Sequence, residues 1–257
     1  MLDIQPIEAF SDNYIWLIRE PGSNRAAVVD PGDAAPVRAV LAEQELELHA
    51  VLITHHHFDH VGGLKELREA FSPRVYGPHN PAIEGIEERL GDGDSIELFG
   101  ARFDVFEVPG HTLDHIAYFH GGDQPVLFCG DTLFAGGCGR LFEGTAPMML
   151  RSLDKLAALP AATQVYCAHE YTLANLAFAR AVEPDNEALQ QRSTEAEQYR
   201  QRGEPTVPSQ LSLELDTNPF LRCREDTLVA NLDAQGRLQE RTPEAVFASV
   251  RGWKDSF

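Results

Sequence analysis

Along the first two thirds of the chain, short apolar runs of β character alternate with longer amphipathic segments. Runs rich in Val, Ile and aromatic residues, bounded by Gly, Pro, Asn or Asp, predict strands, whereas apolar residues spaced three and four apart predict helices. We expect strands over residues 4–7, 14–18, 25–30, 49–54, 74–77, 95–99, 102–108, 116–119, 125–129 and 164–167. We expect helices over residues 36–44, 65–71 and 147–159, and a turn-rich connection over 78–93.

The pattern changes near residue 171. Helical periodicity dominates residues 171–181 and 187–202, prolines then break the chain into loops and short helices, and a last helix is expected over 243–254. We therefore expect an α+β architecture with two domains: residues 1–170, which carry the strands, and residues 171–257, a small helical domain.

Composition excludes some classes of function. A hydrophobic content of 43% is ordinary for a chain that buries a core, and a net charge of -19 (21 basic against 40 acidic residues) argues against general binding of nucleic acid or membrane surfaces. The first residues lack the features of a signal peptide, and no apolar run is long enough to span a bilayer. The four cysteines form no CxxC pair. We expect a cytoplasmic protein, and a monomer.

The candidate chemistry begins at Thr54–His60, with the sequence THHHFDH. This run follows an apolar strand, so it lies where open α/β sheets usually place ligand sites. Neutral imidazoles suit zinc and iron, and a carboxylate adds hard-oxygen character. His55 and His57 project the same way from an extended turn and can share one ion. Asp59 and His60 lie on the following bend and can reach a second.

Three further strand ends each present a residue that can ligate a metal: His111, Asp131 and His169. Their recurrence indicates convergence on one rim of a sheet, where they would meet the Thr54–His60 run. We assign His55, His57 and His111 to one ion, Asp59, His60 and His169 to a second, and Asp131 to a bridging position. Two such ions with an open position can activate water for hydrolysis of an acyl or phosphoryl group.

The remaining histidines have simpler interpretations. His56 should point away from the ions, and His115, with Thr112 and Asp114, could support the ligands by hydrogen bonds. Surface or turn positions are expected for His49, His79 and His120.

The metal-ligand motif resembles that of the metallo-β-lactamase superfamily. Within it, the chain is similar to the glyoxalase II (hydroxyacylglutathione hydrolase) family over nearly its whole length. That narrower resemblance rests on residues 109–112, 137–140, 142–145, 169–172, 178–180, 182–184, 205–209 and 218–222. It implies a four-layer αβ/βα sandwich, two mixed sheets face to face with helices outside, followed by a helical glutathione-binding domain.

The resemblance also implies a reaction. S-D-lactoylglutathione would be hydrolysed to glutathione and D-lactate, the second step of methylglyoxal detoxification, by a hydroxide that bridges two divalent ions. Zinc is expected first, although such ligands also accept iron or manganese. Asp59 and Asp131 would carry the catalysis, Asp59 by binding an ion and orienting the hydroxide.

Glutathione carries carboxylates, so an acidic protein needs a local cationic clamp. The resemblance places substrate binding at Arg140, Tyr171, Arg251 and Lys254. Family members often have a tyrosine where this chain has Phe142, which would remove one hydroxyl contact.

Three alternatives are weighed against this reading. A glutathione persulfide dioxygenase would use one iron on the same fold, but the complete set of second-ion ligands disfavours it. A nuclease of the superfamily is opposed by the net charge of -19. A structural or storage metal site is opposed by the scarcity of cysteine among the ligands.

Overall fold

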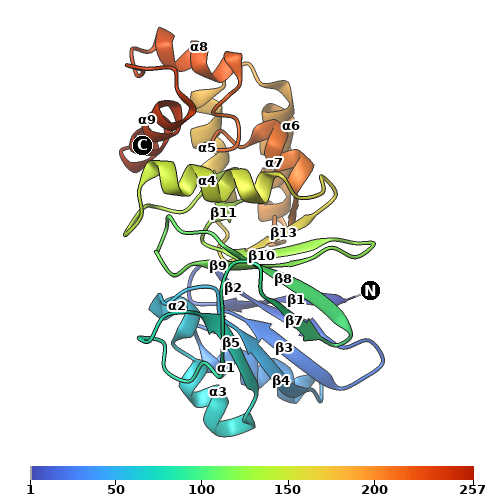
Figure 1. The fold of residues 1–257 in the computed structure, drawn as a ribbon. Helices are drawn as coiled ribbons and strands as arrows, with labels where there is room; N and C mark the ends of the chain where they lie inside the picture. Colours follow the sequence, from blue (N-terminus) through green and yellow to red (C-terminus); the bar gives the residue numbers. More distant parts are fainter. Residues whose placement is uncertain (1) are drawn as a thin grey trace. The chain divides into compact units, whose positions relative to one another are not determined.

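The computed structural model describes residues 2–257, and the chain forms two compact units (Figure 1). The first unit runs to Glu107 and takes in Asp114–Gly130, and the second consists of Val108–Leu113 and Asp131–Phe257. No helix of residues 2–257 has the length and apolarity needed to cross a membrane.

The first unit contains a mixed six-stranded sheet in the order β1-β2-β3-β4-β5-β6. Its strands are β1 (Asp3–Ala9), β2 (Asn13–Arg19), β3 (Arg25–Val29), β4 (Glu47–Leu52), β5 (Arg74–Pro78) and β6 (Glu88–Leu90). The first three strands pair antiparallel and β3 to β6 pair parallel. The parallel pairing places the carboxyl ends of β3 and β4 side by side, with Val29 opposite Leu52.

Both faces of this sheet are buried. Along β2, Ile15 and Leu17 belong to the core shared with helices α1 (Ala34–Glu43) and α3 (Leu64–Phe71), while Trp16 points to the opposite face and is also buried. Figure 1 shows α1 and α3 on one side of the sheet and the strands β7 to β9 on the other. Burial on both faces explains why these strands are continuous apolar runs.

The remaining strands of the first unit form an antiparallel meander in which each pairs with the next. They are β7 (Ser95–Leu98), β8 (Ala101–Glu107), β9 (Ile116–His120) and β10 (Val126–Gly130). The start of β9 is tied to the end of β4, since the Ile116 amide donates to the Thr54 carbonyl at 2.9 Å and the Tyr118 hydroxyl donates to the Ile53 carbonyl at 2.8 Å.

The second unit is mainly helical, with two short antiparallel strand pairs. Its strands are β11 (Leu133–Phe134), β12 (Gly137–Cys138), β13 (Gln164–Cys167) and β14 (Ser209–Gln210). Its helices are α4 (Ala146–Ala157), α5 (Thr172–Val182), α6 (Glu187–Gln201), α7 (Leu211–Thr217), α8 (Asp226–Ala234) and α9 (Pro243–Asp255). Side-chain caps explain where two of these helices begin. Asn186 accepts from the Leu189 amide at the start of α6, and Thr242, which precedes Pro243, accepts from the Ala245 amide at the start of α9.

The strands and helices expected from the sequence are confirmed to within a few residues. The connection over 78–93 contains one strand, β6, that was not expected, and residues 133–138 form the hairpin β11–β12, which was not expected either. The four-residue helix α2 (Phe58–Val61) was also missed. Elements of two to four residues give no periodicity to read. The two compact units are divided at other residues than the domain boundary expected at residue 171, which stays a prediction.

A buried ion pair ties α8 and the loop before it to the end of α5. Arg222 donates to both carboxylate oxygens of Glu183, at 2.8 and 3.1 Å, and this bonding raises the pKa of the guanidinium above its usual value. The Thr227 hydroxyl donates to the same carboxylate, which is almost fully buried.

We expect Arg222→Met to destabilise the protein by about 3 kcal/mol, because it leaves the Glu183 carboxylate buried without its cation. Urea unfolding followed by circular dichroism measures the change. Arg202→Met is the matched control, since it breaks an exposed pair with Glu204 and should leave the midpoint almost unchanged. Equal midpoints for the two variants would contradict the assignment.

The cysteine thiols should be inert in the folded protein. All four are free and buried. Burial raises the pKa of Cys138 to about 11 and that of Cys167 to about 12, and it raises the pKa of Cys223 as well. Because the thiolate is the reactive form, a thiol-reactive disulfide reagent at pH 8 should label none of them until guanidinium unfolds the chain, after which four should react. Rapid labelling of the native protein would contradict this.

Candidate metal centre

The first unit holds its candidate ligands where β3 and β4 end side by side. Asp30 follows β3 and has a left-handed backbone with φ of 53°. Its carboxylate accepts from the Thr54 amide at 2.7 Å and from the Thr54 hydroxyl at 2.7 Å. The turn after Asp30 needs a glycine, because a Cβ at Gly32 would lie 1.8 Å from the Asp59 carbonyl oxygen. The Asp30 turn and the metal-ligand run are therefore one packed structure.

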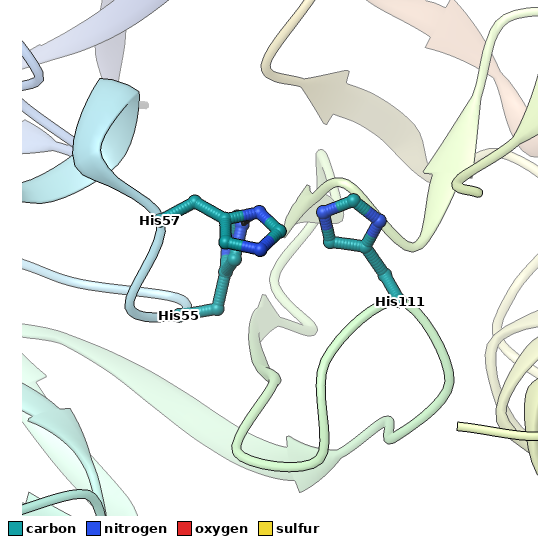
Figure 2. Close-up of side chains that lie close together, drawn as sticks. All are labelled: His55, His57 and His111. Atoms are coloured by element: carbon teal, nitrogen blue, oxygen red, sulfur yellow. Dashed lines mark hydrogen bonds between the residues drawn. The ribbon is translucent and has the colours of Figure 1, made fainter. Parts of the chain in front are cut away.

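His55 and His57 lie on the loop after β4, with their rings turned toward each other (Figure 2). His55 Nε2 lies 3.2 Å from His57 Nδ1. The Thr54 hydroxyl donates its hydrogen bond to Asp30. It can therefore only accept a hydrogen bond from His55 Nδ1, which lies 3.0 Å away. His55 Nδ1 is thus the protonated nitrogen, and Nε2 carries the lone pair.

His60 and Asp59 form a second pair on the short helix α2. His60 is fully buried, and its Nδ1 lies 3.1 Å from Asp30 Oδ2, which can only accept. The lone pair therefore sits on Nε2, 3.4 Å from Asp59 Oδ2. Asn13, at the start of β2, donates to the same Asp59 oxygen at 3.0 Å and so orients the carboxylate.

His56 and His115 support the loop. His56 Nδ1 lies 2.9 Å from Asp114 Oδ1, and Asn80 donates to the other oxygen of Asp114 at 2.8 Å. The His115 ring stacks on His55, with centroids 4.5 Å apart and planes 16° from parallel. The hydrogen bonds of Asp114 agree with the supporting role expected for it, and His115 supports His55 through ring stacking.

The second unit brings His111, Asp131 and His169 together. One carboxylate oxygen of Asp131 lies 3.3 Å from His111 Nε2, and the other lies 3.3 Å from His169 Nε2. His111, labelled in Figure 2 on the loop between β8 and β9, has its Nδ1 2.8 Å from the Arg140 carbonyl. A carbonyl only accepts, so Nδ1 is protonated and Nε2 carries the lone pair that faces Asp131.

Close packing and aromatic rings fix this group. A Cβ at Gly139 would lie 2.0 Å from the Asp131 carbonyl oxygen and 3.0 Å from His111 Nδ1, so only glycine fits. Tyr171 stacks on His169 with centroids 4.7 Å apart and planes 7° from parallel. The exposed ring of Phe142 meets the His111 ring edge-on at 5.3 Å.

Three cationic side chains lie in the second unit around the carboxyl end of α9. Arg251 is buried, and its Nη1 donates to the Cys138 carbonyl at 3.0 Å. Asp255 lies 3.0 Å from Arg251 and 3.6 Å from the exposed Arg140, so it joins the two. Lys254 donates to the Ala174 carbonyl at 3.0 Å, and half-burial, with Arg251 nearby, lowers its pKa.

Each unit therefore gathers the ligand candidates that lie within it: His55, His57, Asp59 and His60 in the first, and His111, Asp131 and His169 in the second. Sequence reasoning missed Asp30, which it placed as the last residue of a strand, and Asn13. The available signal was position, because each is a polar residue next to an apolar strand, Asn13 where one begins and Asp30 where one ends.

The donor chemistry fits divalent metal ions. In His60 and His111 the nitrogen that carries the lone pair lies 3.3 to 3.4 Å from a carboxylate oxygen. Two lone-pair acceptors repel at that separation unless a proton or a metal cation lies between them, and a neutral imidazole whose other N–H is held by an oxygen acceptor is the usual form of a ligating histidine.

Family comparisons agree with this chemistry. Residues 10–169 match the model described as "Metallo-beta-lactamase superfamily", and residues 170–257 match "Hydroxyacylglutathione hydrolase C-terminus". Curated proteins called hydroxyacylglutathione hydrolase from Pseudomonas paraeruginosa and Chromohalobacter salexigens are 56% and 54% identical, over 100% of this chain and of each relative.

Solved structures show the same fold. The crystal structure of ETHE1 from Myxococcus xanthus has a TM-score of 0.65 and 25% identity, and it covers 100% of this chain and 99% of that one. The BLEG-1 B3 metallo-beta-lactamase has a TM-score of 0.64 at 24% identity, covering 86% of this chain and 99% of that one, which shows the fold alone. With both segments matched and full-length relatives above 50% identity, the chain belongs to the hydroxyacylglutathione hydrolase family of the metallo-β-lactamase superfamily.

Proposed function

We propose that the chain hydrolyses the thioester of S-D-lactoylglutathione to glutathione and D-lactate. The observation that carries this proposal is the 56% identity, over the whole of both chains, with curated hydroxyacylglutathione hydrolases. The histidine and aspartate donors of the two units support it, because hydrolysis of an activated acyl group is chemistry that such donors serve when they bind divalent ions. The persulfide dioxygenase alternative is not favoured, since the full-length relatives carry the hydrolase name.

Two ions, zinc first and iron or manganese as substitutes, are proposed. His55, His57 and His111 would hold one, Asp59, His60 and His169 would hold the other, and the Asp131 carboxylate would serve both. Contacts within each unit support this division. His55 lies close to His57, Asp59 lies close to His60, and each Asp131 oxygen lies close to a different imidazole. Divalent cations at such sites supply Lewis acidity and make water a nucleophile near neutral pH.

The protein's own groups prepare this chemistry. Asp30 and the Arg140 carbonyl keep their histidines in the ligating tautomer, and Asn13 fixes the Asp59 carboxylate. Tyr171 covers one face of His169 and shields it from solvent. The departing thiolate has an ordinary pKa of about 8.5, so its expulsion needs little general-acid assistance.

Glutathione binding is assigned to Arg140, Tyr171, Arg251 and Lys254, within the proposed helical domain of residues 171–257 and the loop that ends at Arg140. The Nε of Arg251 is buried without a hydrogen-bond partner among residues 2–257, which suits a donor to a substrate carboxylate. The free, buried cysteines suit a reducing compartment, and we place the enzyme in the cytoplasm as a monomer.

The first experiment follows the loss of thioester absorbance from S-D-lactoylglutathione, with metal content measured on the same sample. Hydrolysis that a chelator abolishes and that zinc, iron or manganese restores is the expected result. A fully metallated protein without thioesterase activity would contradict the proposal, and oxygen uptake with glutathione persulfide would then favour the dioxygenase.

We expect Asp131→Asn to lower the metal content below that of the wild type. Because Asp131 is assigned to both ions, kcat should fall by more than the about 100-fold typical of residues that only support a ligand. Elemental analysis and steady-state kinetics are measured together. Wild-type kcat in a sample with full metal content would contradict the bridging assignment.

Arg251→Ala and Lys254→Ala should raise KM more than they lower kcat, because these cations bind parts of glutathione that do not react. Arg180→Ala, which removes an exposed cation of α5, is the matched control and should leave both constants unchanged. A loss of kcat at constant KM would remove Arg251 and Lys254 from the glutathione site.

A further inference from the structure

The segment Asn218–Arg222 lies far along the sequence from every proposed ligand, yet Asn218 is fully buried. Its Nδ2 donates to the carbonyls of Phe134 at 3.1 Å and Gly137 at 2.9 Å, and lies 3.1 Å from Glu214 Oε2. Its Oδ1 accepts from the Phe220 amide at 3.1 Å, which fixes the orientation of the amide group. Asn218 thus holds both strands of the β11–β12 hairpin.

Two neighbours hold the hairpin turn. Glu214, also fully buried, accepts from the Gly136 amide at 2.9 Å, and Asn175 donates to the Ala135 carbonyl at 3.2 Å. Arg192 in turn pairs with the other oxygen of Glu214. Strands of two residues cannot sustain a hairpin by themselves, so its backbone position is set by these side chains from α5 and α7 and the residue after α7.

This hairpin connects the parts of the second unit that the proposed function uses. Asp131 stands two residues before it. Gly139, directly after it, packs on the Asp131 carbonyl and His111 Nδ1, and the next carbonyl, of Arg140, accepts from His111. Arg251 donates to the Cys138 carbonyl at the end of β12. A shift of the hairpin would therefore move a bridging carboxylate, a ligating imidazole and the cations assigned to glutathione.

We propose that Asn218, supported by Glu214, is a positioning residue that sets Asp131, His111 and Arg251 together through the β11–β12 hairpin. This inference rests on the proposed function: its kinetic readout depends on the proposed reaction, and its metal-binding readout depends only on the assignment of Asp131 and His111 as ligands.

The side chain required is specific. Asn218 must present N–H donors to two backbone carbonyls while its oxygen accepts from Phe220. An aspartate has nearly the same shape, but it would place a carboxylate oxygen against those carbonyls and against the Glu214 carboxylate. Such a contact between acceptors in a buried site is repulsive, so the hairpin must move away.

The test compares Asn218→Asp with the wild type in two measurements. Zinc affinity of the metal-free protein, measured by competition with a chromophoric chelator, should weaken about 10- to 100-fold, as is typical when a residue supporting a ligand is lost. KM for S-D-lactoylglutathione should rise as well, because Arg251 shifts with Cys138. Weaker zinc binding in a protein that proves not to hydrolyse this thioester would keep the inference while rejecting the proposed function.

Two controls separate positioning from lost stability. Asn231→Asp makes the same substitution in the same unit at a side chain whose one acceptor among residues 2–257 is the Val182 carbonyl. Arg222→Met breaks a buried ion pair four residues from Asn218 that makes no hydrogen bond to the hairpin. Both should lower the unfolding midpoint without changing zinc affinity or KM.

If Asn218→Asp does not fold, Asn218→Ser is measured instead, because it removes the amide donors without burying a second carboxylate. It should weaken zinc binding and raise KM more than Arg222→Met does at an equal loss of stability. Zinc affinity and KM within about twofold of the wild type would overturn the proposal.

Discussion

The proposed metal site depends on the tautomer of its imidazoles. An imidazole binds a metal through its unprotonated nitrogen, and a hydrogen bond donated by the other N–H fixes which nitrogen that is. His55, His60 and His111 make this hydrogen bond with different acceptors: the Thr54 hydroxyl, the Asp30 carboxylate and the Arg140 carbonyl. Each acceptor is itself fixed. Asp30 takes two hydrogen bonds from Thr54, and Arg140 follows the glycine that packs on Asp131. The parallel pairing of β3 with β4 makes the first of these arrangements possible, because it sets Asp30 beside Thr54.

In the second unit, side chains remote in sequence fix the backbone that carries the candidate ligands. Its candidate ligand loops have little regular structure, so buried polar side chains on or next to the helices hold the hairpin backbone: Asn218, Glu214 and Asn175. In addition, Thr206, on the loop before β14, donates its amide and hydroxyl to the Glu170 carboxylate beside His169. Buried polar groups are costly unless satisfied, which makes such a network specific. The helical segment thereby supports the candidate ligands of this unit and also carries most of the residues proposed to bind glutathione.

Much of this could be predicted from the sequence. The candidate ligands were found as histidines and aspartates at the ends of apolar strands, and each unit brings its own members close together. The strands were readable because burial on both faces leaves continuous apolar runs. The short elements were not: β6, β11 and β12 exist through pairing with neighbours, and two or three residues carry no periodicity of their own.

The sequence by itself determined the family and the candidate donors, since residue types at strand ends and motifs spread over the chain are local properties. Only the tertiary structure decided which groups fix those donors. Asp30 resembles any turn aspartate until β3 lies beside β4, and Asn218 resembles any loop asparagine until its amide lies against the carbonyls of Phe134 and Gly137. Hydrogen bonds between residues 24 or 84 positions apart leave no pattern in a single sequence, because they depend on how distant segments pack.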